Sequence, residues 1–319
     1  MWYHSTEEER KSMLEVCLLG TGGTVPLPQR WLTSCYVRCR GESVLIDCGE
    51  GTQIALHEQR FSCKQIGTIL LTHFHADHTA GLPGMLLTMA KSERTEPVTI
   101  IGPQGLKEFL DGVFAIARYV PFEIRYAELT EDEVAFQAGD LKITAFAVRH
   151  SVRTYAYKIE LDRNRRFDAD KARSNNVPVR LWSRLQKGET AEQDGIVYTP
   201  DQVLGEERKG LKMVYVTDTR PTDAILEHSR NADLLIAEGM YGDPECIEKA
   251  KKNRHMLMQE SAAIAAEAGA KRLWFTHYSP MEKDPGMYQE EIAKIFPGCL
   301  ISEDGQRIDL AFESEEDNV

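Results

Sequence analysis

The chain has 319 residues, 42% of them hydrophobic, which is enough for one large core or two ordinary ones. No segment approaches the roughly 18 apolar residues of a membrane span, and the N-terminal MWYHSTEEERKS lacks the apolar core of a secretion signal. We therefore expect a soluble cytoplasmic protein with no membrane partner. The net charge of −12 argues against general affinity for nucleic acid, because Lys and Arg provide most phosphate contacts.

The seven cysteines are odd in number and contain no Cys-x-x-Cys pair. A disulfide framework is therefore not expected, and most cysteines should be reduced core residues. Cys35 and Cys39 are spaced to lie on one face of a strand, where packing is expected rather than metal binding.

Short β-branched runs alternate with helical patterns along the chain. The predicted strands are 14–19, 35–38, 43–46, 69–71, 98–101, 141–148, 155–160, 213–216, 234–237, 273–276 and 308–312. The predicted helices are 52–58, 82–89, 106–117, 223–229, 261–268 and 288–295. This alternation predicts an α/β protein whose sheets are covered by helices.

Residues 162–195 are polar, basic and rich in turn formers, and they predict an arm inserted into a single domain spanning 1–319. From Arg149 to Lys187, eleven Lys and Arg stand against four Asp and Glu, a local charge of +7. Such asymmetry fits an anion-binding arm on an acidic body. A solvated insertion without a partner is the alternative.

Polar side chains are crowded into THFHADH, directly after the predicted strand 69–71. His73, His75, Asp77 and His78 all carry free lone pairs, and crowding them is costly unless a cation binds them. Further residues of the same type follow other strands: His150, Asp218 and His277. Because ligands gather at one edge of the sheets in α/β proteins, we expect these side chains to form a metal centre.

These motifs resemble the metallo-β-lactamase superfamily, and more closely the ribonuclease Z group of tRNA 3′-processing endonucleases. The likeness covers almost the whole chain and includes LLGTGGTVPLP, LIDCGEGTQIAL, THFHADHTAGLPGML, VYVTDTRP, AEGMY and HMLMQESAAIAAEAGAKRLWFTHYSP. It implies a metallo-β-lactamase αββα sandwich with a protruding basic arm. It also implies precursor tRNA as substrate, and a homodimer in which each arm reaches over the partner's active site.

The resemblance further implies two Zn²⁺ per chain, although His and carboxylate ligands also accept Mn²⁺ or Fe. It assigns one ion to His73, His75 and His150, the second to Asp77, His78 and His277, and the bridge between them to Asp218. Asp77 would orient the attacking water or take its proton.

The additional active-site histidine of the family matches His255, which lies 22 residues before His277. His255 is expected to protonate the leaving 3′ oxygen or to bind the scissile phosphate. Glu238 would orient His255, unless it is only an edge-strand carboxylate.

Four arginines are candidates for substrate binding. Arg163, Arg165 and Arg166 lie in the predicted arm, and neutralising them should weaken RNA binding. Arg220 in DTRP is either a brace for the Asp218 loop or a substrate contact. GTGGT at 20–24 is expected to be a turn, because no Lys-Ser or Lys-Thr follows it as in a phosphate-binding loop.

The resulting prediction is a dinuclear zinc endoribonuclease that removes the 3′ trailer from precursor tRNA. One alternative is a phosphodiesterase for small or cyclic nucleotide diesters, and another is a non-catalytic RNA-binding protein with structural metals. The chain departs from the family pattern in substrate-handling positions, with Arg30-Trp31 in place of Arg-Asn and no Gly-Pro near Pro178. Every expected metal ligand is present.

Overall fold

The computed structural model describes residues 14–313 and divides the chain into two compact units. The first unit comprises everything outside Asp162–Gly210, and the second is Asp162–Gly210 itself. None of the helices within the described range combines the length and the apolar character needed to cross a membrane.

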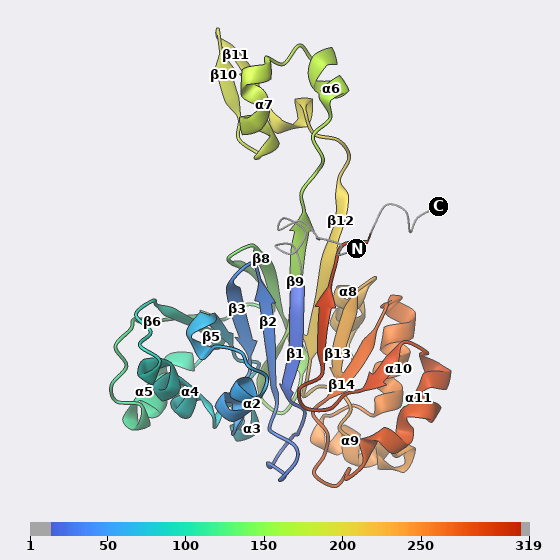
Figure 1. Cartoon of the computed structure of the whole chain (residues 1–319). Coiled ribbons are helices and arrows are strands. Elements are labelled where there is room, and N and C mark those ends of the chain that lie inside the picture. The colour runs from blue at the N-terminus through green and yellow to red at the C-terminus, as the bar shows by residue number, and fades with distance from the viewer. Residues whose placement is uncertain (1–13, 314–319) are drawn as a thin grey trace, which may run out of the picture. The chain divides into compact units, whose positions relative to one another are not determined.

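One sheet of the first unit has the strand order β16-β1-β2-β3-β4-β5-β6. Its strands are β1 (Leu14–Gly20), β2 (Ser34–Cys39), β3 (Glu42–Ile46), β4 (Ile66–Leu70), β5 (Val98–Pro103), β6 (Ile124–Leu129) and β16 (Arg307–Leu310). Pairing is antiparallel from β16 to β3 and parallel from β3 to β6. The helices α2 (Thr52–Glu58), α3 (Ala76–Thr79), α4 (Leu82–Lys91) and α5 (Leu106–Ile116) lie on its outer side (Figure 1).

The other sheet has the order β15-β14-β13-β12-β9-β8-β7. Its strands are β7 (Glu133–Ala138), β8 (Leu141–Arg149), β9 (Arg153–Arg163), β12 (Arg208–Val216), β13 (Leu234–Glu238), β14 (Leu273–Thr276) and β15 (Cys299–Ile301). The strands from β12 to β15 are parallel, and those from β7 to β9 are antiparallel. On its outer side lie α8 (Asp223–Ser229), α9 (Ile247–Asn253), α10 (Met258–Ala268) and α11 (Gln289–Ile295) (Figure 1).

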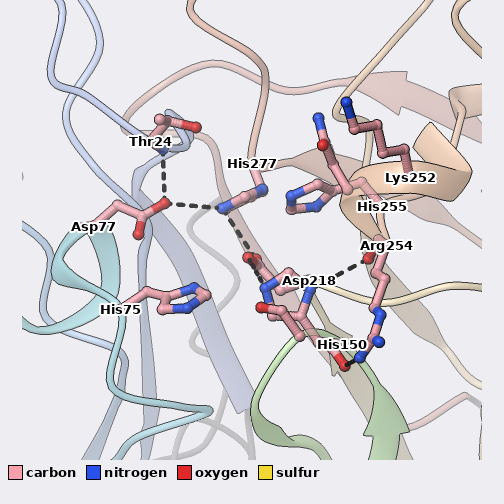
Figure 2. A pocket seen from close by; sticks show the side chains of 11 residues that line it. Thr24, His75, Asp77, His150, Asp218, Lys252, Arg254, His255 and His277 are labelled. Carbon is pink, nitrogen blue, oxygen red and sulfur yellow. Dashed lines mark hydrogen bonds and ion pairs between the residues drawn. The ribbon is translucent and has the colours of Figure 1, made fainter. Parts of the chain in front are cut away.

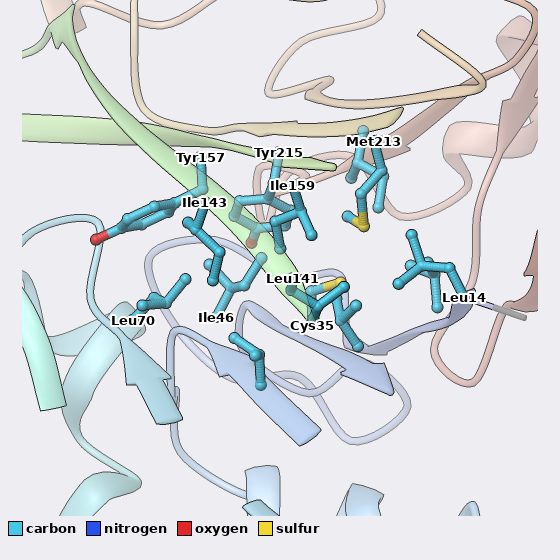
Figure 3. Packing of buried hydrophobic residues seen from close by; sticks show 14 of the residues in the cluster. Leu14, Cys35, Ile46, Leu70, Leu141, Ile143, Tyr157, Ile159, Met213 and Tyr215 are labelled. Carbon is cyan, nitrogen blue, oxygen red and sulfur yellow. The ribbon is translucent and has the colours of Figure 1, made fainter. Parts of the chain in front are cut away.

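The main core lies between the two sheets, where Ile46 and Leu70 of one sheet meet Ile143 and Tyr215 of the other (Figure 3). Strand alternation explains why β1 is apolar at every position except Glu15: Leu14, Val16 and Leu18 face the core between the sheets, while Cys17 and Leu19 face the helices. The layers are therefore helix, sheet, sheet, helix, as an αββα sandwich requires.

The cysteines match the sequence analysis. All seven are free thiols, and all but Cys246 are buried. Cys35 and Cys39 share one face of β2 and pack in the core between the sheets, so the expected packing of this pair is confirmed.

The second unit contains α6 (Ala169–Ser174), α7 (Val179–Gln186), β10 (Ala191–Gln193) and β11 (Ile196–Tyr198). It has a small core of its own, in which Tyr198, Val203 and Leu204 pack with Leu181 and Leu185 of α7. These contacts explain why the unit extends to Gly210, beyond the expected insertion 162–195.

The charge of the second unit is smaller than that of the window from Arg149 to Lys187. Residues 162–210 contain ten Lys and Arg against nine Asp and Glu. Acidic partners also engage some of these cations, as in the ion pairs Arg165–Asp201 and Arg184–Glu189.

Each predicted strand and helix has a counterpart in the structure, with ends shifted by a few residues. The strands and α-helices that the sequence analysis missed are β6, β7, β15, α3 and α9, together with α6, α7, β10 and β11 of the second unit. In both β6 and β7, five of the six residues are exposed or half-exposed and charged or polar residues interrupt the apolar ones, so neither gives the continuous apolar run that identifies a buried strand.

Candidate metal centre

The residues expected to form a metal centre meet at the ends of strands from both sheets (Figure 2). His73 follows β4, His150 follows β8, Asp218 follows β12 and His277 follows β14. Asp218 and His277 have left-handed φ angles of 51° and 57°. Non-glycine residues rarely adopt this conformation, and it is often retained where function requires a particular side-chain direction.

Two groups of donor atoms share Asp218. One of its carboxylate oxygens, Oδ2, lies 3.6 Å from Nε2 of His73 and 3.5 Å from Nε2 of His150. The other, Oδ1, lies 3.2 Å from Nε2 of His78 and 3.0 Å from Nε2 of His277. The ligand atoms within each group lie within 4.8 Å of one another: His73, His75, His150 and Asp218 in the first, and Asp77, His78 and His277 in the second. The structure thus brings all seven sequence-predicted ligands together.

The outer ring nitrogens of three of these histidines have partners that fix the rings. Nδ1 of His78 lies 2.7 Å from the Asp47 carboxylate, and Nδ1 of His73 lies 3.0 Å from the Thr72 hydroxyl. The backbone carbonyl of Arg254 lies 3.2 Å from Nδ1 of His150. When Nδ1 is engaged in this way, Nε2 is left to face the centre, as in histidines that bind metals.

The residues fit a bound cation. Nε2 of His73 and Nε2 of His150 are buried without a hydrogen-bond partner in the described structure, which is costly unless something binds them. Burial lowers the pKa of His73 well below its ordinary value and that of His150 to about 4, so both present neutral nitrogens. A set of imidazoles and carboxylates is the donor set of zinc, manganese and iron.

The second group is more strongly charged. Burial lowers the pKa of His277, but the carboxylates of Asp218 and Asp77 outweigh it and raise the pKa to about 10. In a protein without a metal, these carboxylates therefore hold a proton on His277. A metal cation would replace that proton, since ligand binding requires the neutral imidazole.

The GTGGT loop is a turn, as expected, and it also packs against the centre. The backbone N–H of Thr24 donates a 2.6 Å hydrogen bond to Oδ2 of Asp77. Gly23 lies so close to the His277 ring that a Cβ at this position would be 2.7 Å from it. The loop therefore helps to hold Asp77 and His277 in place.

His255 lies beside the centre and is paired with Glu238. Nδ1 of His255 lies 2.8 Å from Oε2 of Glu238, whose Oε1 accepts a 2.6 Å hydrogen bond from the Thr219 N–H. Burial lowers the pKa of His255, but the Glu238 carboxylate outweighs it, and the net pKa is above the ordinary value. Glu238 is fully buried at the end of β13, a central strand, so the alternative of an edge-strand carboxylate is wrong.

Arg220 is held away from solvent by neighbouring groups. Its Nη1 donates a 2.8 Å hydrogen bond to the Glu260 carboxylate and a 2.5 Å hydrogen bond to the His255 carbonyl, and its Nη2 is paired with the same carboxylate. Of the two interpretations that the sequence left open, this arrangement favours the brace. Arg220 connects the turn that carries Asp218 with the segment that carries His255.

The site opens into a pocket of about 580 Å³, which His75, Asp77, Asp218 and His255 line together. Metal-assisted cleavage of a phosphate ester requires metal ligands and a side chain that can donate a proton to the leaving oxygen. The His and Asp ligands and His255 meet these two requirements.

The three arm arginines lie in or at the second unit, and the structure shows a definite role for one of them. Arg165 donates hydrogen bonds to the Gly205 carbonyl at 2.6 Å and to the Asp201 carboxylate at 2.5 Å. These contacts tie the two ends of the unit together. Arg163 and Arg166 also have interaction partners, so none of the three is an unengaged charge.

Sequence reasoning missed four residues of the site: Asp47, Thr72, Thr24 and Arg254. For Asp47 a signal was present, because it directly follows the strand 43–46 in the same way that the expected ligands follow theirs. It also has a left-handed φ, of 59°. Thr24 acts through its backbone N–H, Thr72 through its hydroxyl and backbone N–H, and Arg254 through its carbonyl and its guanidinium, and none of these contacts leaves a pattern in a sequence.

Known proteins and family models match most of the length of this chain. The chain is 48% identical to a ribonuclease Z of Lachnoclostridium phytofermentans over 304 residues, covering 95% of this chain and 100% of the relative. It is 47% identical to a ribonuclease Z of Agathobacter rectalis over 303 residues, with the same coverage. Two family models also match, "Anti-Pycsar protein Apyc1" over residues 14–185 and "Beta-lactamase superfamily domain" over residues 159–278.

Solved structures share the fold. Human tRNase Z, short form, superimposes with a TM-score of 0.66 at 24% identity, covering 92% of this chain and 98% of that one. The metallo-β-lactamase fold protein YhfI of Bacillus subtilis gives a TM-score of 0.68 at 20% identity, covering 93% of this chain and 100% of that one. The expected sandwich with two mixed sheets is thereby confirmed.

Proposed function

Because the chain belongs to the ribonuclease Z family of the metallo-β-lactamase superfamily, we propose that its seven converging His and Asp side chains hold two metal ions for cleavage of precursor tRNA. The activity itself, metal-dependent endonucleolytic processing of the tRNA 3′ end, is that of the family. The residues that perform it in this chain are inferred from their geometry.

The observation that carries the proposal is the division of the Asp218 carboxylate between two donor groups. Its Oδ2 faces His73 and His150, and its Oδ1 faces His78 and His277. A carboxylate in this position suits a bridge between two cations. We assign His73, His75 and His150 to one zinc and Asp77, His78 and His277 to the other, and the donor set equally admits Mn²⁺ or Fe.

Two ions of this kind supply an activated water and charge stabilisation for an in-line phosphoryl displacement. Asp77 is positioned to orient that water, because Thr24 holds its Oδ2 and leaves Oδ1 for a further contact. His255 donates a proton to the leaving 3′ oxygen, and Glu238 orients the imidazole and raises its pKa. The water oxygen bonds to phosphorus as the bond to the 3′ oxygen breaks, leaving a 3′-hydroxyl on the tRNA.

We propose further that the second unit, Asp162–Gly210, is the arm that grips tRNA, in a homodimer where each arm reaches over the partner's site. Arg163, Arg165 and Arg166 contribute to this surface. Since the unit is nearly neutral, recognition depends on where its cations stand rather than on its net charge. The cytoplasm is the compartment in which we expect this reaction.

A phosphodiesterase for small nucleotide diesters remains the competing function. It would need only the metal centre and the pocket beside it, and not the second unit. A scaffolding protein with structural metals is disfavoured, because the ligands border a pocket that His255, paired with Glu238, also lines.

The test is cleavage of a labelled precursor tRNA with a short 3′ trailer, beside a small chromogenic phosphodiester, with zinc or manganese supplied. A single cut after the discriminator base that is lost in Asp218→Ala supports the proposal. Turnover of the small diester without any cut in the RNA would instead support the competing function.

A further inference from the structure

One side of the pocket is formed by the end of α9 and has no role in the mechanism above. Lys252, Asn253 and Arg254 line the pocket directly before His255 in the chain. The helix ends at Asn253, and the residue that caps it, Arg254, has a left-handed φ of 61°. In Figure 2 the Lys252 side chain lies beside His255, on the side of the pocket away from His75.

This side of the pocket is fixed to the centre by reciprocal contacts. Arg254 donates from Nη1 to the His150 carbonyl, and its own carbonyl lies 3.2 Å from Nδ1 of His150. The Asn253 amide donates a 3.2 Å hydrogen bond to the Tyr241 hydroxyl, and the His255 N–H donates one of 2.9 Å to the Ala250 carbonyl. The backbone of Lys252 is therefore held at a set position relative to both His150 and His255.

The charge of Lys252 is uncompensated. Its side chain is exposed, and in the described part of the chain no carboxylate lies within the 4.0 Å of an ion pair. The two other lysines near the end of α9 differ from it. Lys251 pairs with Glu248 at 2.8 Å, and Lys249 lies over the Tyr241 ring. Lys252 is thus the lysine of this helix that faces the pocket with its charge available.

We propose that Lys252 binds a backbone phosphate of the RNA substrate, the one immediately upstream of the scissile linkage. The inference rests on the proposed function. The oxygen that His255 protonates belongs to the last nucleotide of the tRNA. That nucleotide therefore lies on the His255 side of the scissile linkage. The next phosphate on its 5′ side then meets the ammonium group, which binds phosphate as a point charge. A small diester has no such phosphate, so this contact favours a polynucleotide over a mononucleotide substrate.

The experiment uses the metal-loaded full chain with precursor tRNA and a small chromogenic diester. For Lys252→Ala, we expect kcat/KM on the RNA to fall about five- to tenfold relative to that on the diester, mainly through KM. The slope of log affinity against log salt should weaken by about 0.7, the value for one phosphate contact on a single strand. Lys252→Arg should recover most of the loss, and the matched control Lys251→Ala should cleave as the parent does.

A chemical change in the substrate identifies the phosphate. A neutral methylphosphonate at the linkage upstream of the cleavage site should weaken cleavage by the parent and have little further effect in Lys252→Ala. Additive effects, or an unchanged RNA-to-diester ratio in Lys252→Ala, would overturn the inference while leaving the nuclease intact. If the parent enzyme does not cut precursor tRNA, the proposed function itself fails.

Discussion

The carboxylate of Asp47 lies 2.7 Å from Nδ1 of His78, and both side chains are completely buried. The same carboxylate accepts a 2.8 Å hydrogen bond from the Thr72 N–H, at the start of the segment that carries His73. Asp47 therefore connects β3 with the ligand loop after β4 and determines which nitrogen of His78 faces the centre. Its effect on the metal is indirect, through the orientation of the ring.

We predict that Asp47→Ala weakens zinc binding by about 10- to 100-fold, the usual effect of removing a group that orients a metal ligand. Competition with a chromogenic chelator would measure it. Asp140→Asn is the control, because Asp140 is an exposed carboxylate that pairs with Arg40. Equal affinities in the parent and in Asp47→Ala would show that packing alone orients His78.

Gly23→Ala should reduce activity and metal content together. Its new Cβ would be 2.7 Å from the His277 ring, a distance that forces the ring or the loop to move. Gly112 in α5 has nothing within 4 Å of such a Cβ, so Gly112→Ala should be neutral or stabilise the fold by about 0.5–1 kcal/mol. Metal analysis and thermal unfolding of both variants would check this pair. Full metal content and activity in Gly23→Ala would contradict the close packing against His277.

His255→Ala should distinguish between leaving groups. An RNA 3′ oxygen leaves poorly without a proton, whereas a nitrophenolate needs none. We therefore expect kcat to fall by about 10²- to 10⁴-fold on precursor tRNA and by far less on a nitrophenyl diester. Glu238→Gln should show the same selectivity with a smaller loss, because Glu238 acts on the leaving group through His255 and the Gln side chain can still accept the hydrogen bond from the Thr219 N–H. Equal losses on both substrates would assign His255 to phosphate binding.

His228 offers a pH effect far from the metal centre. It stacks on Phe146 and lies 3.6 Å from Glu133, with Lys158, Glu160 and Lys212 as further charged neighbours. Burial lowers its pKa below the ordinary value, so protonation favours the unfolded chain. His228 therefore lowers the free energy of unfolding as the pH falls through about 6.5, the pKa expected for a histidine in the unfolded state.

We predict that His228→Gln loses less stability than the parent between pH 7.5 and pH 5. The melting temperatures of both proteins would be measured across that range. Any shift in melting temperature that the substitution itself causes does not depend on pH, and this constant shift is subtracted. The remaining difference between the two proteins should then vanish toward neutral pH. A difference that does not depend on pH would mean that His228 does not titrate in this interval.

The sequence was most informative where the chemistry is local. Four of the seven expected ligands lie within six residues, and the other three follow strands with strong apolar patterns, so both the ligands and their convergence could be predicted. His255 could not be assigned from local pattern, because a single histidine before a helix has no distinctive context. Only its family position identified it. Its pairing with Glu238 depends on the parallel placement of β13 beside β12 and β14, which no local pattern encodes.

The extent of the arm along the chain could not be predicted from the sequence. The window from Arg149 to Lys187 is strongly basic, but the folded unit begins later and ends at Gly210. It therefore includes Asp201, Glu206 and Glu207, which reduce its charge. The boundary is set by the packing of Tyr198, Val203 and Leu204, apolar residues that lie in a polar stretch.

The division of the centre between two sheets has a consequence for synthesis on the ribosome. THFHADH belongs to the first sheet, while His150, Asp218 and His277 belong to the second. His277, the last of these ligands, lies 204 residues after His73, the first of them. A nascent chain therefore cannot complete the centre until His277 has emerged from the ribosome, long after the loop that carries the first four ligands.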